Sequence, residues 1–167
     1  MIWIRTALFI CTVVSVKYIF SSVNDDGDEK IKKMKELINF TQYLRVYSCD
    51  MKMSIEEIYE KYNFKSIDTE MLIKSLINFL EDKKSSKEFM DYINKIMYTS
   101  KEFNSYFAEI IDYYGLAYSE VLDKKLNFTS EEMERVMKEF SVSHGEKKTL
   151  NNRISFLAGC LAAIILV

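Results

Sequence analysis

Charge is distributed very unevenly along this 167-residue chain. All 25 acidic residues and 20 of the 23 basic residues lie between Asp25 and Lys148, and only Arg5, Lys17 and Arg153 lie outside that interval. The interior is therefore water-soluble and carries a net charge of −5, while both ends are apolar. An acidic interior argues against nucleic acid as a partner, because phosphate binding needs a basic patch.

The N-terminal apolar segment runs from Ile2 to Phe20. As a helix, its 19 residues would rise about 28 Å, which is close to the thickness of a bilayer core. Arg5 and Lys17 lie near its ends, where long basic side chains reach the interface. We predict a transmembrane helix in residues 1–22. A cleaved signal peptide is the alternative, although no small-residue cleavage motif follows the apolar run.

The C-terminal segment from Ile154 to Val167 contains no charged residue. Its 14 residues span only about 21 Å as a helix, but extension back through Arg153 and local thinning of the bilayer make a short span feasible. We predict a second transmembrane helix in residues 151–167. A buried core helix is the alternative, and the lack of a polar face favours lipid.

Both apolar segments contain small residues at helical spacing. Such faces let helices approach closely, which is a main source of helix association in lipid. The stripes consist of Ala7, Cys11 and Ser15 in the first segment and of Ser155, Gly159 and Ala163 in the second. We expect the two spans to pack together, within one molecule or between copies.

The interior, residues 24–150, is predicted to be helical throughout. Proline is absent and only four glycines occur, so the two main interrupters of helices are scarce. Four capping boxes, each a Ser or Thr with a Glu three residues later, mark expected helix starts: Ser54 with Glu57, Ser85 with Glu88, Thr99 with Glu102 and Thr129 with Glu132. Apolar residues follow each of them at helical spacing.

The expected fold is all-α, an antiparallel bundle of about six helices between the two transmembrane helices. A longer helix from about Asp28 to Cys49 would open the bundle, and short turns are expected near Asn63, Lys84, Ser100 and Gly115.

No pattern typical of an active site or a cofactor site is found. The one histidine, His144, lies in a polar stretch and is expected at the surface. No glycine-rich nucleotide-binding motif occurs. The run from Asn24 to Asp28 resembles the start of a calcium loop, but counting from Asp25 puts Lys30 at the sixth position, where such a loop needs glycine. The sequence therefore predicts a protein with no catalytic, metal-binding or cofactor-binding residues.

A cluster of tyrosines near Gly115 is the candidate partner surface. It consists of Tyr113, Tyr114 and Tyr118. Amphipathic rings of this kind bind partners, and they also pack at the edges of helical bundles.

The basic residues that flank the apolar segments indicate which side of the membrane the interior faces. They are Lys30, Lys32, Lys33 and Lys35 after the first segment and Lys147, Lys148 and Arg153 before the second. By the positive-inside rule, the interior is expected to face the cytoplasm.

Three stretches of the chain resemble the stage III sporulation protein AB family. Leu37-Ile38 through Gln42, with Leu44 and Arg45, resembles that family's first cytoplasmic helix, and Ile110 to Gly115 resembles its leucine-and-glycine segment. The closing Ile154–Val167 resembles its small-residue C-terminal span. The chain departs from the family at Tyr47-Ser48 and at Met53-Ser54-Ile55, and it needs a small insertion before Ser119.

The resemblance implies a non-enzymatic platform protein of a secretion-like channel used in endospore formation. The family's cytoplasmic domain is similar to the helical domains of the type II secretion platform protein. The implied location is the bacterial inner membrane, as the mother-cell membrane around the forespore. The implied partners are other channel subunits, a secretion-type ATPase, membrane lipids and further copies of the chain. Two other readings stay open: a membrane-tethered extracytoplasmic sensor or ligand-binding helical module, and a membrane enzyme of unrecognised type.

Overall fold

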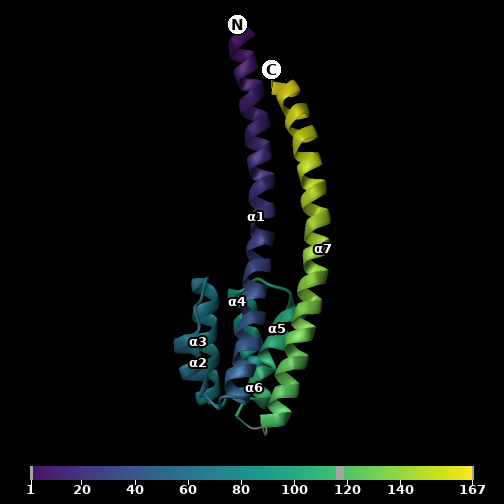
Figure 1. Ribbon diagram of the computed structural model, residues 1–167. Helices are drawn as coiled ribbons and strands as arrows, with labels where there is room; N and C mark the ends of the chain where they lie inside the picture. The colour runs from purple at the N-terminus through teal and green to yellow at the C-terminus, as the bar shows by residue number, and fades with distance from the viewer. Residues whose placement is uncertain (1, 116–118, 167) are drawn as a thin grey trace. The chain divides into compact units, whose positions relative to one another are not determined.

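The computed structural model describes residues 2–115 and 119–166, and every regular element in those ranges is a helix (Figure 1). The all-α prediction is confirmed. The helices are α1 (Ile2–Cys49), α2 (Ile55–Lys61), α3 (Ile67–Glu81), α4 (Ser86–Ile96), α5 (Lys101–Ala108), α6 (Ile110–Tyr113) and α7 (Ser119–Leu166).

The chain divides into two compact units. The arm unit combines the beginning of α1, up to Glu29, with the end of α7 from Phe140 onward. The core unit is Lys30–Glu139. Both α1 and α7 continue without a break through the places where the sequence analysis set domain boundaries, between 22 and 24 and between 150 and 151.

Helix starts in the core unit follow the predicted caps in two cases of four. Ser54 and Glu57 form the full reciprocal capping box of α2, and the Ser85 side chain accepts the backbone N–H of Glu88 at the start of α4. At α5 the cap is Ser100 and not Thr99, whose hydroxyl bonds Asn104 instead.

The fourth predicted cap is also wrong as a helix start. Thr129 lies inside α7, which begins at Ser119, and its hydroxyl pairs with the hydroxyl of Tyr113 at 2.6 Å.

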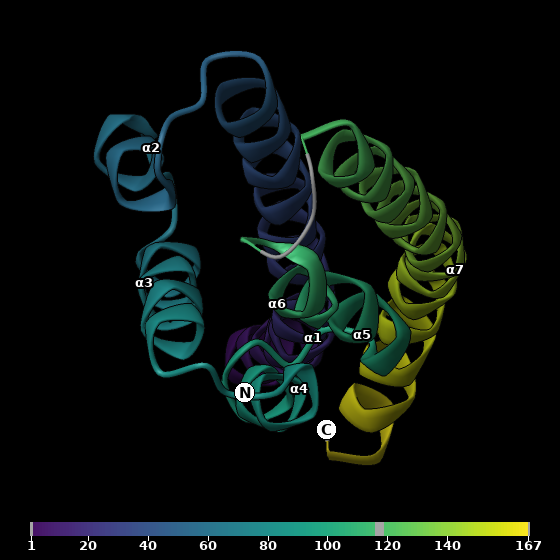
Figure 2. The same cartoon turned by 90° about the horizontal axis from the view of Figure 1, so that it is seen from below.

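The interior of the core unit is built largely from aromatic and branched side chains. Helix α6 lies against α3, α4 and α5 (Figure 2). The largest fully buried residues include Phe40, Phe89, Phe103 and Phe107. Phe89 contacts Phe107 with ring centroids 6.2 Å apart, so rings from α4 and α5 meet in the same core.

One buried carboxylate also belongs to this core. Glu36 of α1 is only 6% exposed, and its two oxygens accept the backbone N–H of Lys65 and, at 2.5 Å, the hydroxyl of Thr69. Ser66, the N-cap residue of α3, makes no side-chain cap of its own. Glu36 therefore anchors the start of α3 to a different helix, where a negative charge also suits the helix dipole.

Candidate functional site

The two helical segments of the arm unit, which we call the arms, approach each other closely at Gly159. A Cβ at Gly159 of α7 would lie 3.1 Å from the Cα of Val13 of α1, so glycine alone fits there without a shift of the backbone. Ser155 and Ala163, one helical turn to either side, are buried as well. The predicted small stripe of the C-terminal segment thus faces α1.

The predicted small stripe of the N-terminal segment lies elsewhere. Ala7, Cys11 and Ser15 are exposed. The partly buried residues of this part of α1 are larger and share another face: Phe9, Thr12, Val13, Val16 and Phe20. The reason is complementarity, since one helix supplies the small residues and the other supplies the side chains that fill the space above them.

The remaining surface of the two apolar arms exposes large hydrophobic side chains. On α1 these are Trp3, Ile4, Leu8, Ile10, Val14, Tyr18, Ile19 and Val23, and on α7 they are Ile154, Phe156, Leu157, Leu161, Ile164 and Ile165. By length and composition, α1 can cross a membrane, a test that signal sequences and core helices of soluble proteins also pass. The C-terminal segment is shorter, and the second span remains a prediction.

We expect that Gly159→Leu pushes the two arms apart, because the new side chain meets the backbone of Val13. Spin labels at the exposed positions Ile10 and Leu161, in a chain whose native cysteines are replaced by alanine, should report a separation larger by about 2–3 Å. Ala7→Leu is the matched control, since Ala7 is exposed and its replacement should leave the separation unchanged. Equal separations in both variants would show that the close approach is not formed.

A buried asparagine layer adjoins the apolar arms. Asn24 of α1 is 3% exposed, and its side-chain oxygen accepts a hydrogen bond from Asn151 of α7 at 3.0 Å. Its amide nitrogen donates to Asn152 at 3.3 Å. Both groups of the Asn24 side chain are therefore satisfied by the facing helix, which fixes the register of the two arms.

The single histidine of the chain lies in α7 and packs against α1, one helical turn beyond Asn24. His144 shares a hydrogen bond with Asp28 at 2.9 Å, and only 12% of its side chain is exposed. The expectation of a surface histidine is therefore wrong. A Cβ at Gly27 would lie 2.2 Å from the His144 ring, so the absence of a side chain at Gly27 is what admits the imidazole.

Lys148 completes this polar contact by donating to the second oxygen of Asp28 at 2.6 Å. The hydrogen bonds from Lys148 and His144 lower the pKa of Asp28. The ionised carboxylate therefore stabilises the pairing of the arms at pH values above the ordinary pKa of aspartate. This stabilisation is lost as the pH falls through the lowered pKa.

These polar contacts were not predicted from the sequence. A usable signal was present, since Asn24 and Asp28 lie four residues apart, as do His144 and Lys148, so that each pair shares one helical face.

Two of the three tyrosines of the candidate partner surface face inward. Burial raises the pKa of both Tyr113 and Tyr114 to about 12. The hydroxyl of Tyr113 shares a hydrogen bond with the hydroxyl of Thr129, as described above. Tyr118 lies outside the described residues, so the structure places only part of this cluster.

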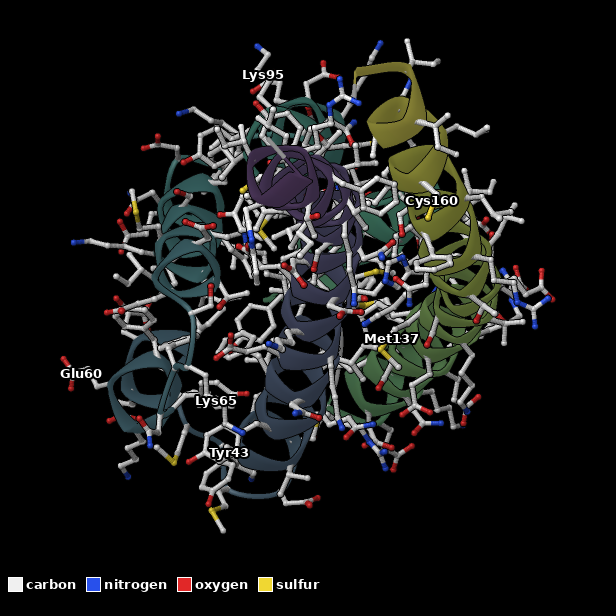
Figure 3. All side chains as sticks on the ribbon, turned by 90° about the horizontal axis from the view of Figure 1, so that it is seen from above. Tyr43, Glu60, Lys65, Lys95, Met137 and Cys160 are labelled. Atoms are coloured by element: carbon white, nitrogen blue, oxygen red, sulfur yellow. The ribbon has the colours of Figure 1, made fainter. Side chains whose placement is uncertain are left out.

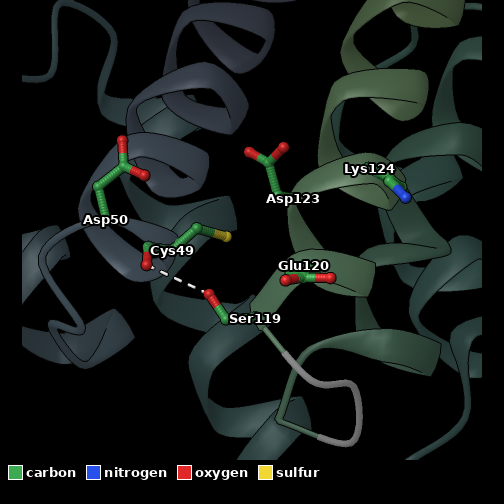
Figure 4. Close-up of a pocket in the computed structure, with 6 residues that line it drawn as sticks. All are labelled: Cys49, Asp50, Ser119, Glu120, Asp123 and Lys124. Carbon is green, nitrogen blue, oxygen red and sulfur yellow. Dashed lines mark hydrogen bonds between the residues drawn. The ribbon is translucent and has the colours of Figure 1, made fainter.

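A hollow of about 280 Å³ in the core unit brings Cys49 close to acidic side chains (Figure 4). It is lined by Cys49, Asp50, Ser119, Glu120, Asp123 and Lys124. Burial raises the pKa of the Cys49 thiol, which keeps it in the protonated, weakly nucleophilic form. Within residues 2–115 and 119–166, no group of three or more His, Cys, Asp or Glu side chains is arranged to hold a metal ion.

Comparison with protein families, curated proteins and solved structures finds no match to this chain.

Proposed function

We propose that this chain is a non-enzymatic, membrane-anchored assembly component. In this proposal both arms of the arm unit cross the membrane, and the core unit acts as an antiparallel helical bundle that binds other proteins. Its mechanism is recruitment and positioning, which requires anchors and surfaces rather than reactive groups.

The observation that supports the proposal is the distribution of side chains on the arms, with small residues between the two helices and large apolar residues on the outside. The face between the arms is closed by Ser155, Gly159 and Ala163, while large apolar side chains point outward from both helices. Exposing these side chains to water would be costly, at about 25 cal/mol for each Å² of apolar surface. Lipid is the surrounding in which such a helix pair is favourable.

The resemblance to the stage III sporulation protein AB family supplies the specific form of the proposal. The chain would serve as the platform of a secretion-like channel between mother cell and forespore, linking a secretion-type ATPase to other membrane subunits. The lysines and the arginine that flank the apolar segments favour a core unit on the cytoplasmic side.

The orientation can be tested with a cysteine reporter. Lys87 is exposed in the core unit, whereas the Cys49 thiol is partly buried and has a raised pKa. We therefore suggest Lys87→Cys in a chain whose native cysteines are replaced by alanine, labelled with a membrane-impermeant maleimide. We expect label only after the cells are permeabilised, and labelling of intact cells would place the domain outside.

The partner can be tested separately by cross-linking in intact cells. We expect recovery of a secretion-type ATPase whose gene neighbours that of this chain. A membrane fraction that holds the chain without any such partner would contradict the platform while leaving the anchor in place.

A further inference from the structure

The outer face of α7 in the arm unit has a hollow of about 400 Å³. It is lined by Gly145, Glu146, Thr149, Leu150 and Arg153. Gly145 lies at an open end of the hollow, since a Cβ there would have no neighbour within 4 Å. The hydroxyl of Thr149 donates to the carbonyl of Gly145 at 3.0 Å, which leaves its oxygen free to accept.

The two charges of the hollow lie in a fixed order along the helix. Arg153 directly precedes the apolar segment, and Glu146 lies seven residues earlier, about 10 Å away along the axis. Helical side chains lean toward the N-terminus of the helix, so the Arg153 guanidinium reaches back toward Thr149 and shortens this separation. Neither charge has an ion-pair partner within residues 2–115 and 119–166.

A phospholipid headgroup has the same order of charges. Its phosphate lies next to the acyl chains, and an ethanolamine headgroup places a primary ammonium beyond the phosphate. Guanidinium groups bind phosphate through paired hydrogen bonds, and an ammonium offers three donors to carboxylate and hydroxyl oxygens. A headgroup with no ammonium would leave Glu146 without a cation to pair with and close to the negative phosphate.

We propose that this hollow binds the headgroup of a phospholipid that carries a primary ammonium. Arg153 holds the phosphate, Glu146 and the Thr149 oxygen accept the ammonium, and Leu150 lies against the methylene groups that join the phosphate to the ammonium. The inference rests on the proposed membrane anchoring of the arm unit.

The test is native mass spectrometry of the full chain released from vesicles of equal parts dioleoyl phosphatidylethanolamine, phosphatidylglycerol and phosphatidylcholine. We expect phosphatidylethanolamine to be retained preferentially. Glu146→Gln should abolish this preference while phosphatidylglycerol is retained at least as well, and Arg153→Gln should lower retention of all three lipids about fivefold. Lys124→Gln, in the core unit, is the control and should change nothing.

The outcomes separate the two proposals. If the chain inserts but retains the three lipids equally, or prefers phosphatidylglycerol in both wild type and Glu146→Gln, the headgroup site is excluded and the membrane anchor stands. If the chain does not partition into vesicles of any composition, both proposals are excluded.

Discussion

Replacing Glu36 by alanine is expected to destabilise the core unit by about 3 kcal/mol or more. Two hydrogen bonds to a buried carboxylate are lost, and bonds to a charged group contribute about 1.5–3 kcal/mol each. The Lys65 backbone N–H then loses its acceptor, whereas the Thr69 hydroxyl keeps only its hydrogen bond to the Ser66 carbonyl at 2.9 Å. The effect should be centred on α3, although Glu36 itself belongs to α1.

Hydrogen exchange of the α3 amides, measured on the full chain in detergent, reports this loss locally. A change of 3 kcal/mol corresponds to exchange about a hundredfold faster. Glu36→Gln should lie between wild type and Glu36→Ala, because its amide oxygen can still accept one of the two bonds. Glu60→Ala is the matched control, since Glu60 is exposed and points away from the helices (Figure 3).

Protection of α3 that is equal in Glu36→Ala and Glu60→Ala would contradict the anchoring of the start of α3 by Glu36. A uniform loss of protection over the whole core unit would show instead that Glu36 supports the fold as a whole and not the start of α3.

Helix content was predictable from the sequence because the local signals agree. The scarcity of glycine and proline, the capping serines and the helical spacing of apolar residues all favour the same state. Turns were expected near Asn63, Lys84, Ser100 and Gly115, and helices end close to each of these positions. The errors arose at Thr99, where the neighbouring Ser100 is the cap and the Thr99 hydroxyl bonds Asn104, and at Thr129, where the helix has already begun at Ser119.

The contacts between helices were less predictable than the helices themselves. Small residues mark a face that can approach a neighbour, but Gly159 meets Val13 rather than the matching stripe at Ala7 and Cys11. The hydrogen bonds of Glu36 at the start of α3 join residues about thirty positions apart, beyond the reach of any local motif. His144 was expected at the surface because its neighbours in sequence are polar, whereas its environment is set by Gly27.

Substitutions at two glycines of the arm unit are expected to act in opposite directions. Alanine is more favourable than glycine within a helix by about 1 kcal/mol. At Gly145 nothing stands within 4 Å of the new methyl group, so Gly145→Ala should stabilise the helix by about that amount. At Gly27 the methyl group would lie 2.2 Å from the His144 ring, and the ring must leave its hydrogen bond with Asp28.

The net effect of Gly27→Ala is therefore a loss of about 1–3 kcal/mol, because overpacking costs about 1–3 kcal/mol, the lost hydrogen bond adds about 1 kcal/mol, and the helix preference of alanine offsets about 1 kcal/mol. Hydrogen exchange of the α7 amides around His144 should become about tenfold faster, whereas Gly145→Ala should slow it. The double variant Gly27→Ala with His144→Ala removes the clash, so the two substitutions should be strongly non-additive. Simple additivity would mean that His144 does not lie over Gly27 in solution, and the polar contact between the arms would then have to be formed by the Asn24 layer and by the pair of Lys148 with Asp28.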